Sequence, residues 1–186
     1  MEIVDSIKSS FTALLGDTAY NQITVAQICK KASVSKKTFY RHFDSKHEIL
    51  VAFIKDDIVE PVKNLRELLP LDSIKSAPLL VMERSHHILY EHRFLYKNLI
   101  ESLGRMALAE LFTNITYELN YEIYSNFDLS PRDRDFAAYF VAAASAMIQT
   151  RWLEQGCPID EKQMAKLTDI WVMSHWREAG IAAGSK

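Results

Sequence analysis

Basic side chains gather in one short stretch of this chain, between Thr24 and His47, where they have the chemistry to bind phosphate. The stretch holds one acid, Asp44, and six basic residues, which are Lys30, Lys31, Lys36, Lys37, Arg41 and Lys46. Its formal charge is therefore +5, whereas the whole 186-residue chain carries −2 and the remainder −7. A basic window on an acidic protein is typical of a surface that meets nucleic acid. Charge alone is equally typical of a solvated helix face.

A short helix is predicted to begin at Val25, because Thr24 and Gln27 have the spacing of a capping box. Apolar residues then recur at three- and four-residue spacing and predict an inward face, made of Val25, Ile28, Cys29 and Ala32. Ala32-Ser33-Val34 interrupts this periodicity. The interruption predicts a turn after the first helix.

A second helix is predicted over residues 36–42, capped by Ser35, with Phe39 and Phe43 one turn apart and facing inward. A third helix is predicted to begin at Lys46. A helix, a tight turn and a second helix at this scale are typical of the helix-turn-helix, whose second helix lies in a DNA major groove.

These residues resemble the TetR-type transcriptional regulators. The resemblance is carried by three segments, TVAQI (24–28), ASVS (32–35) and TFYRHF (38–43), the last followed by Ser45-Lys46. It covers roughly residues 3–50. The chain departs from the family at Ser33, where the family usually has glycine. A non-glycine residue with positive φ is strained, so the turn is expected to be slightly strained or re-angled.

The resemblance implies an all-α fold in two parts. Residues 1–46 are expected to form a three-helix helix-turn-helix domain that binds DNA, and residues 47–186 an α-helical domain for ligand binding and dimerisation. The implied DNA contacts are Thr24, Ser35, Lys36, Lys37, Thr38, Tyr40, His42 and Lys46. Ser35, Lys36 and Lys37 would meet base edges or the backbone, and the others phosphates.

Composition agrees with a helical protein that has a sizeable core. Hydrophobic residues make up 48% of the chain, and no run approaches the roughly 20 apolar residues of a membrane span. The two cysteines, Cys29 and Cys157, do not suggest a disulfide framework, so we expect a reducing, cytoplasmic compartment. No cofactor and no metal are expected.

The remaining apolar periodicity predicts a first helix near residues 3–16 and five later ones, over residues 79–92, 94–103, 105–126, 130–154 and 160–178. The helix that begins at Lys46 is expected to kink or end at Pro61, because proline lacks a backbone donor. We hypothesise that this helix links the two domains mechanically. Residues 70–78 are predicted to be a loop, and the tail from Ala179 to Lys186 is predicted to fray.

The last two helices carry much apolar surface and suit a four-helix interface with a second copy of the chain. The resemblance implies the same homodimer. A dimer doubles the base contacts and implies an inverted-repeat site in double-stranded DNA.

Six residues are candidates for a pocket that takes a small-molecule effector, and these are Phe53, Met82, His86, Tyr90, Phe112 and Tyr139. His86 lies on an apolar helix face, so it is either a core histidine or a polar contact in a ligand cavity. The tyrosine row at 117, 121 and 124 has three interpretations, which are ordinary packing, a pocket wall and a subunit contact.

Two other classes of function compete with a regulator. A helical enzyme with a di-metal site needs two Glu-x-x-His motifs, and the sequence holds one, Glu83–His86. It holds no common phosphate-binding or nucleophile motif. An interaction protein that has lost DNA binding conflicts with the intact basic window. The sequence therefore favours a ligand-responsive transcription factor, and a repressor rather than an activator.

Overall fold

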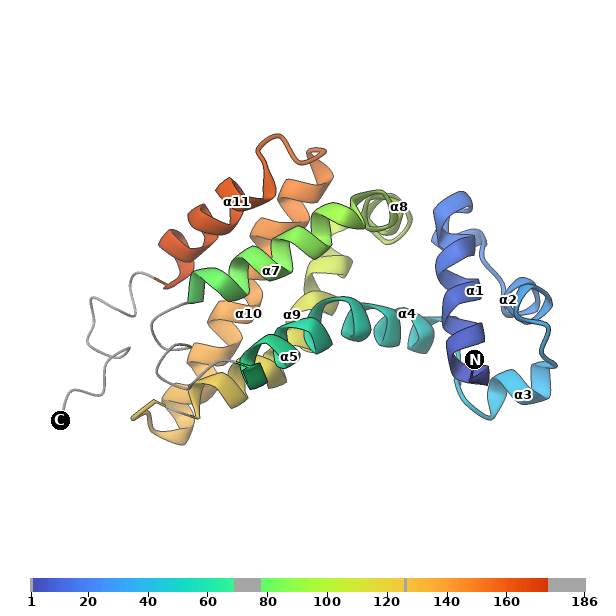
Figure 1. Ribbon diagram of the computed structural model, residues 1–186, viewed down its shortest axis with the longest axis horizontal. Helices are drawn as coiled ribbons and strands as arrows, with labels where there is room; N and C mark the ends of the chain where they lie inside the picture. Colours follow the sequence, from blue (N-terminus) through green and yellow to red (C-terminus); the bar gives the residue numbers. More distant parts are fainter. Residues whose placement is uncertain (1, 69–77, 126, 174–186) are drawn as a thin grey trace.

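The computed structural model describes residues 2–68, 78–125 and 127–173, and all of its elements are helical (Figure 1). The predicted loop at 70–78 lies outside the described residues, except Pro78, which begins a helix. The predicted frayed tail also lies outside them. A small head occupies one end of the elongated molecule and consists of α1 (Ile3–Asp17), η1 (Tyr20–Gln22), α2 (Val25–Ala32), α3 (Lys36–Tyr40) and the start of α4 (Lys46–Ile54).

The caps predicted in the head are present. Thr24 and Gln27 form a complete capping box at the start of α2. The hydroxyl of Ser35 accepts the N–H of Thr38, which starts α3. Helix α3 ends at Tyr40, two residues earlier than predicted, and a turn carries the chain into α4. The core of the head is formed by fully buried side chains, including Ile7, Phe11, Leu15, Ile28, Phe39 and Ile49.

The helix that leaves the head continues past Pro61 instead of ending there. A π-helical turn, η2 (Lys55–Val59), follows α4, and α5 (Glu60–Leu68) follows directly. In the π-turn the N–H of Glu60 donates to the carbonyl of Lys55, five residues back. Pro61, which has no backbone N–H to donate, follows directly after this π-turn as the second residue of α5. An irregularity is therefore present near Pro61, as predicted, but it is a π-turn within a continuous helix and not the end of a helix.

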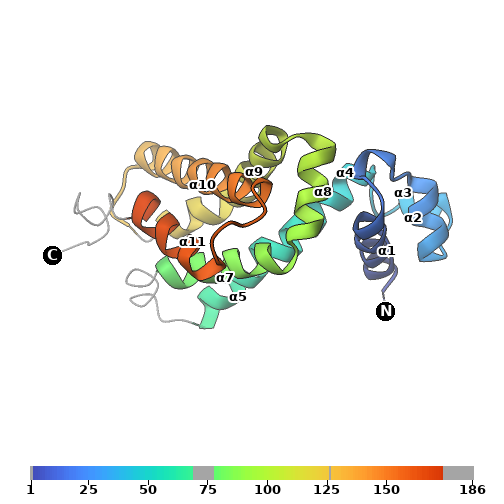
Figure 2. The ribbon, with the colours of Figure 1, turned by 90° about the horizontal axis from the view of Figure 1, so that it is seen from above.

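The second part of the molecule is a helical bundle formed by α5, α7 (Pro78–Glu91), α8 (Arg93–Leu103), α9 (Arg105–Tyr124), α10 (Pro131–Glu154), α11 (Glu161–Thr168) and a π-turn, η3 (Asp169–Met173). Gly104, at φ 88°, forms the predicted break before α9. Ser130 and Pro131 begin α10 as predicted, with the Ser130 hydroxyl accepting the N–H of Asp133. Helices α9 and α10 lie side by side, and α7 packs on α11 (Figure 2).

One continuous apolar core runs from the head into the bundle. It joins Phe11 and Phe39 in the head to Tyr96 and Phe112 in the bundle, and reaches Trp152 of α10. None of the helices that the structure describes combines the length and apolar character needed to cross a membrane.

Candidate nucleic-acid interface

The N-terminus of α3 presents a capped, positively charged helix start. Ser35 and both lysines that follow it are exposed. The Ser35 hydroxyl accepts from Thr38 N at 3.0 Å and lies 2.9 Å from Thr38 Oγ1. The cap fixes where the helix begins, so Lys36 and Lys37 project from its first turn. Such a helix start favours an anion electrostatically.

The turn between α2 and α3 has the geometry expected of Ser33. This residue lies in the left-handed region, at φ 55° and ψ 37°, and ends α2. The N–H of Val34 donates to the carbonyl of Cys29 at 3.0 Å, which satisfies a carbonyl at the helix end. The fold therefore keeps a turn suited to glycine, and the serine occupies it at a conformational cost.

Three of the remaining predicted contacts have different environments along the head. Thr24 is exposed at the start of α2, where its hydroxyl accepts from Gln27 N at 3.2 Å. The Tyr40 ring is 53% exposed and lies edge-on against the buried ring of Phe39. Tyr40 is therefore held against the core of the head on one side and remains open to solvent on the other. His42 is half-buried, and its Nε2 lies 3.5 Å from the guanidinium of the exposed Arg41.

Lys46 differs from the other predicted phosphate contacts, because its ammonium already has protein partners. Its Nζ donates to the carbonyls of Tyr20 (2.8 Å), Ile23 (2.8 Å) and Asn21 (3.4 Å). It also lies 4.5 Å from the centre of the Tyr20 ring, and burial lowers the pKa of Lys46. An ammonium has three donors, and three carbonyls take them. A phosphate would have to displace one of these carbonyls.

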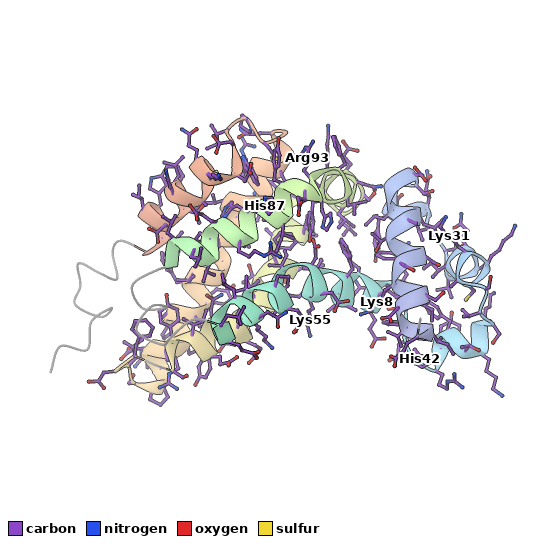
Figure 3. The ribbon with its side chains drawn as sticks, viewed as in Figure 1. Lys8, Lys31, His42, Lys55, His87 and Arg93 are labelled. Carbon is purple, nitrogen blue, oxygen red and sulfur yellow. The ribbon has the colours of Figure 1, made fainter. Side chains whose placement is uncertain are left out.

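Figure 3 places Lys31 on α2 and His42 just after α3, on the end of the molecule remote from the bundle. Lys55 lies along the connecting helix, which is the continuous helix formed by α4, η2 and α5. Arg41 belongs to the basic window but is not one of the predicted DNA contacts, and the structure exposes it at the end of α3. Within the ranges that the structure describes, no group of three or more His, Cys, Asp or Glu residues is arranged to hold a metal ion.

The predicted effector residues fall into two aromatic groups and one separate residue. In the first group, Phe53 lies 6.0 Å from Tyr96 between ring centres, and Tyr96 meets Phe112 edge-on at 5.5 Å. Tyr96 is fully buried and donates its hydroxyl to the carboxylate of Asp57, in the π-turn. His92 Nδ1 lies 2.6 Å from the other oxygen of that carboxylate. Burial raises the pKa of Asp57.

The second group surrounds Trp152. Its ring lies 5.7 Å from that of His86 and 6.1 Å from that of Tyr90, between centres. His86 is fully buried, donates from Nδ1 to the carbonyl of Met82 at 2.8 Å, and has Nε2 3.3 Å from Thr168 Oγ1. Burial lowers the pKa of His86 to about 4. Both ring nitrogens have neighbours, which favours the core histidine.

Tyr139 lies apart from both groups. It is 56% exposed and lines a surface hollow of about 290 Å³ with Asn114, Tyr117, Asp135 and Phe136. Helical periodicity does not show that Tyr139 faces outward. The residue lies in an apolar run of α10, and the outer face of that run also carries exposed aromatic residues. Of the tyrosine row, Tyr124 is buried, whereas Tyr117 and Tyr121 are half-buried.

Sequence comparison identifies both parts of the chain. A family description for bacterial regulatory proteins of the tetR family matches residues 12–53. A second, for the C-terminal region of transcriptional regulators, matches residues 78–174, which is more than half of the chain. Together with the helix-turn-helix head, these matches define a DNA-binding transcriptional regulator. The chain belongs to the TetR family and is not an enzyme.

Known relatives are distant but similar along most of their length. The chain is 22% identical over 158 residues to the HTH-type dhaKLM operon transcriptional activator DhaS of Lactococcus lactis subsp. lactis strain IL1403, covering 83% of this chain and 81% of that protein. A solved structure of the dihydroxyacetone kinase operon activator DhaS has a TM-score of 0.60 at 18% identity, over 95% of this chain and 97% of that one.

Two further solved structures share the fold. The fatty acid degradation regulator FadR from Bacillus halodurans gives a TM-score of 0.60 at 18% identity and covers 95% of this chain and 97% of its own. A TetR transcriptional regulator from Streptococcus agalactiae 2603V gives 0.57 at 19% identity, over 91% and 93%. These likenesses establish the fold.

Proposed function

We propose that the protein binds an inverted-repeat operator as a homodimer and represses transcription until a small molecule binds its helical domain. The observation that supports the homodimer is a stripe of exposed apolar side chains on α10. Phe136, Phe140 and Met147 lie on one face of that helix and are 62%, 51% and 38% exposed. Exposed apolar side chains that cluster in this way mark an interaction surface.

Exposed apolar side chains are also present on η3, the last element that the structure describes. Ile170 and Trp171 of η3 are each about half exposed. Trp171 and Met147 line one groove of about 370 Å³ between α10 and α11. A two-fold axis through this surface pairs α10 and α11 with their copies and covers the apolar groups of both chains. Each dimer then carries two heads, one for each half of a palindrome.

On each half-site, the proposed contacts divide by type. Lys36 and Lys37, with Ser35, approach base edges from the start of α3, whereas Thr24, Thr38, Tyr40 and His42 contact phosphates. The support is that these residues lie on or beside α2 and α3 and that most of them are exposed, with Thr38 and His42 half-buried. We place the domain boundary between residues 46 and 47, although the core is continuous across it.

Effector binding is proposed for the aromatic groups around Tyr96 and Trp152. The π-turn of η2 supports this location, because such turns recur at functional sites. It carries Asp57 among aromatic rings and sits where the connecting helix leaves the head. An effector that binds one arrangement of these helices better than another shifts the spacing of the two heads.

Repression is proposed because it requires only that the dimer occupy DNA, whereas activation also requires a contact with the transcription machinery. The Lactococcus relative is described as an activator, so activation is the competing outcome. A reporter gene downstream of the selected operator, with and without the protein, distinguishes the two by the sign of the change.

The DNA interface is tested by comparing two variants. Lys36→Ala with Lys37→Ala removes two exposed cations of α3, and Lys55→Ala removes an exposed cation of the connecting helix. With about six phosphates neutralised per dimer, wild-type affinity should fall with salt with a log–log slope near −5. The double variant should flatten the slope and weaken binding, and Lys55→Ala should match the wild type. Equal behaviour of both variants would refute the placement of the interface.

A further inference from the structure

The short helical turn η1 is held from three sides through one residue, Tyr20. Its ring is buried and meets Phe11 of α1 edge-on. Its N–H points to α8, where it donates to Asn98 Oδ1 at 3.1 Å and to Ser102 Oγ at 3.0 Å. Its carbonyl accepts from Lys46 Nζ of α4 at 2.8 Å. Tyr20 thus connects the bundle, the first helix of the head and the connecting helix.

Asn98 completes this arrangement from the side of the bundle. Its Nδ2 donates to the carbonyls of Leu15 (2.7 Å) and Thr18 (2.9 Å), at the end of α1. The last carbonyls of a helix have no partner within the helix, so an amide from another helix satisfies them. Ser102 donates to Asn98 Oδ1 at 3.1 Å and holds the amide in this orientation. Figures 1 and 2 both show α8 beside α1.

We propose that Asn98 and Lys46 are positioning residues that together fix the angle of the DNA-reading head on the regulatory bundle. Asn98 ties η1 and the end of α1 to α8 of the bundle, and Lys46 holds η1 against the start of α4 within the head. This inference rests on the proposed dimeric operator and adds how the heads are held at one spacing. Hydrogen bonds of 2.7 to 3.1 Å tolerate little change in length. A shift of α8 against α4 by about 1 Å therefore turns the head or breaks the connection.

The proposal assigns Lys46 a role other than a phosphate contact. Its three donors are taken by the carbonyls of Tyr20, Asn21 and Ile23. Loss of the ammonium should free η1 from α4 and leave the number of phosphate contacts unchanged. A phosphate contact makes the opposite prediction, because each lost contact reduces the salt slope by nearly one, or about two per dimer.

The test measures how strictly the full-length dimer requires its half-site spacing. Fluorescence anisotropy gives Kd for the selected operator and for duplexes with one base pair inserted or removed between the half-sites. The spacing ratio is the Kd for an altered duplex divided by the Kd for the selected operator. This ratio does not depend on the fraction of active protein, so general destabilisation does not change it. The variants are Asn98→Ala and Lys46→Met, and the control is Lys97→Ala, the exposed neighbour of Asn98 on α8.

We expect Asn98→Ala and Lys46→Met each to lower the ratio by at least about fivefold, the factor that one net hydrogen bond supports. Lys97→Ala should keep the wild-type ratio, and Lys46→Met the wild-type salt slope. A wild-type ratio in folded Asn98→Ala, or a flatter slope in Lys46→Met, would overturn the proposal.

If Asn98→Ala does not fold, Asn98→Asp replaces it in the same assay, since it keeps the shape and the acceptor but loses both donors. If neither variant folds, the network serves global stability and the proposal is overturned. Wild-type protein without any spacing preference would instead refute the proposed dimeric operator.

Discussion

Acid should destabilise this protein through one buried side chain, His86. The imidazole has no exposed surface and donates from Nδ1 to the carbonyl of Met82. Burial lowers its pKa to about 4, whereas an unfolded histidine has a pKa of about 6.5. Between these values the unfolded chain binds a proton that the folded chain does not. The folded state is therefore favoured at neutral pH and loses this advantage as the pH falls.

The size of the effect follows from the two pKa values. Each unit of difference corresponds to about 1.4 kcal/mol, so the shift to about 4 amounts to about 3 kcal/mol of unfolding free energy. The loss should begin near pH 6.5 and be complete near pH 4. His86→Gln removes the titrating group but keeps a polar side chain. The free-energy difference between wild type and variant isolates His86, because other groups titrate in both.

The assay is urea unfolding followed by helical circular dichroism, at fixed protein concentration, over this pH range. The wild type should lose about 3 kcal/mol more than His86→Gln between about pH 7 and about pH 4. His87→Gln is the matched control, since His87 is exposed on the same helix, and it should follow the wild type. If wild type and His86→Gln have parallel pH profiles, the imidazole is solvated and the core interpretation is refuted.

Three other perturbations test separate parts of the account. Tyr40→Phe should weaken binding to operator and to random DNA by similar factors, because a phosphate contact carries no sequence information; a loss confined to the operator would contradict that role. Phe140→Asp should shift the protein to monomers in sedimentation velocity, whereas Phe94→Asp, at a phenylalanine exposed on α8, should leave dimers; equal behaviour of the two would remove α10 from the interface. Ser33→Gly should raise the unfolding free energy by about 0.5 to 1 kcal/mol, since glycine adopts the left-handed conformation without strain, and an unchanged or lower value would show that the serine is not strained.

Local features of the head were predictable because their causes are local in sequence. The capping box of Thr24 and Gln27 joins residues three apart, and the inward face of α3 depends on the spacing of Phe39 and Phe43. Both rings are buried. The strained turn at Ser33 was expected from the family's usual glycine at that position, and Ser33 is left-handed. The capping box and the Phe39–Phe43 pair each lie within one or two helical turns.

Other features depend on contacts between residues remote in sequence, which periodicity does not encode. Lys46 reaches back 26 residues to the carbonyl of Tyr20, and a motif alone suggests a cation facing solvent. Asn98 lies about 80 residues from the end of α1 that it satisfies. The partnership of Asp57 with Tyr96 similarly requires the π-turn, and Pro61 alone indicated only an irregularity.

The central claim is that this chain reads a specific DNA sequence as a dimer, and selection from a random duplex pool tests it most directly. Purified full-length protein at near-physiological salt is allowed to bind the pool, and the retained duplexes are sequenced through successive rounds. The account predicts enrichment of one inverted repeat with a fixed distance between its half-sites. Retention of DNA without any enriched sequence would contradict it.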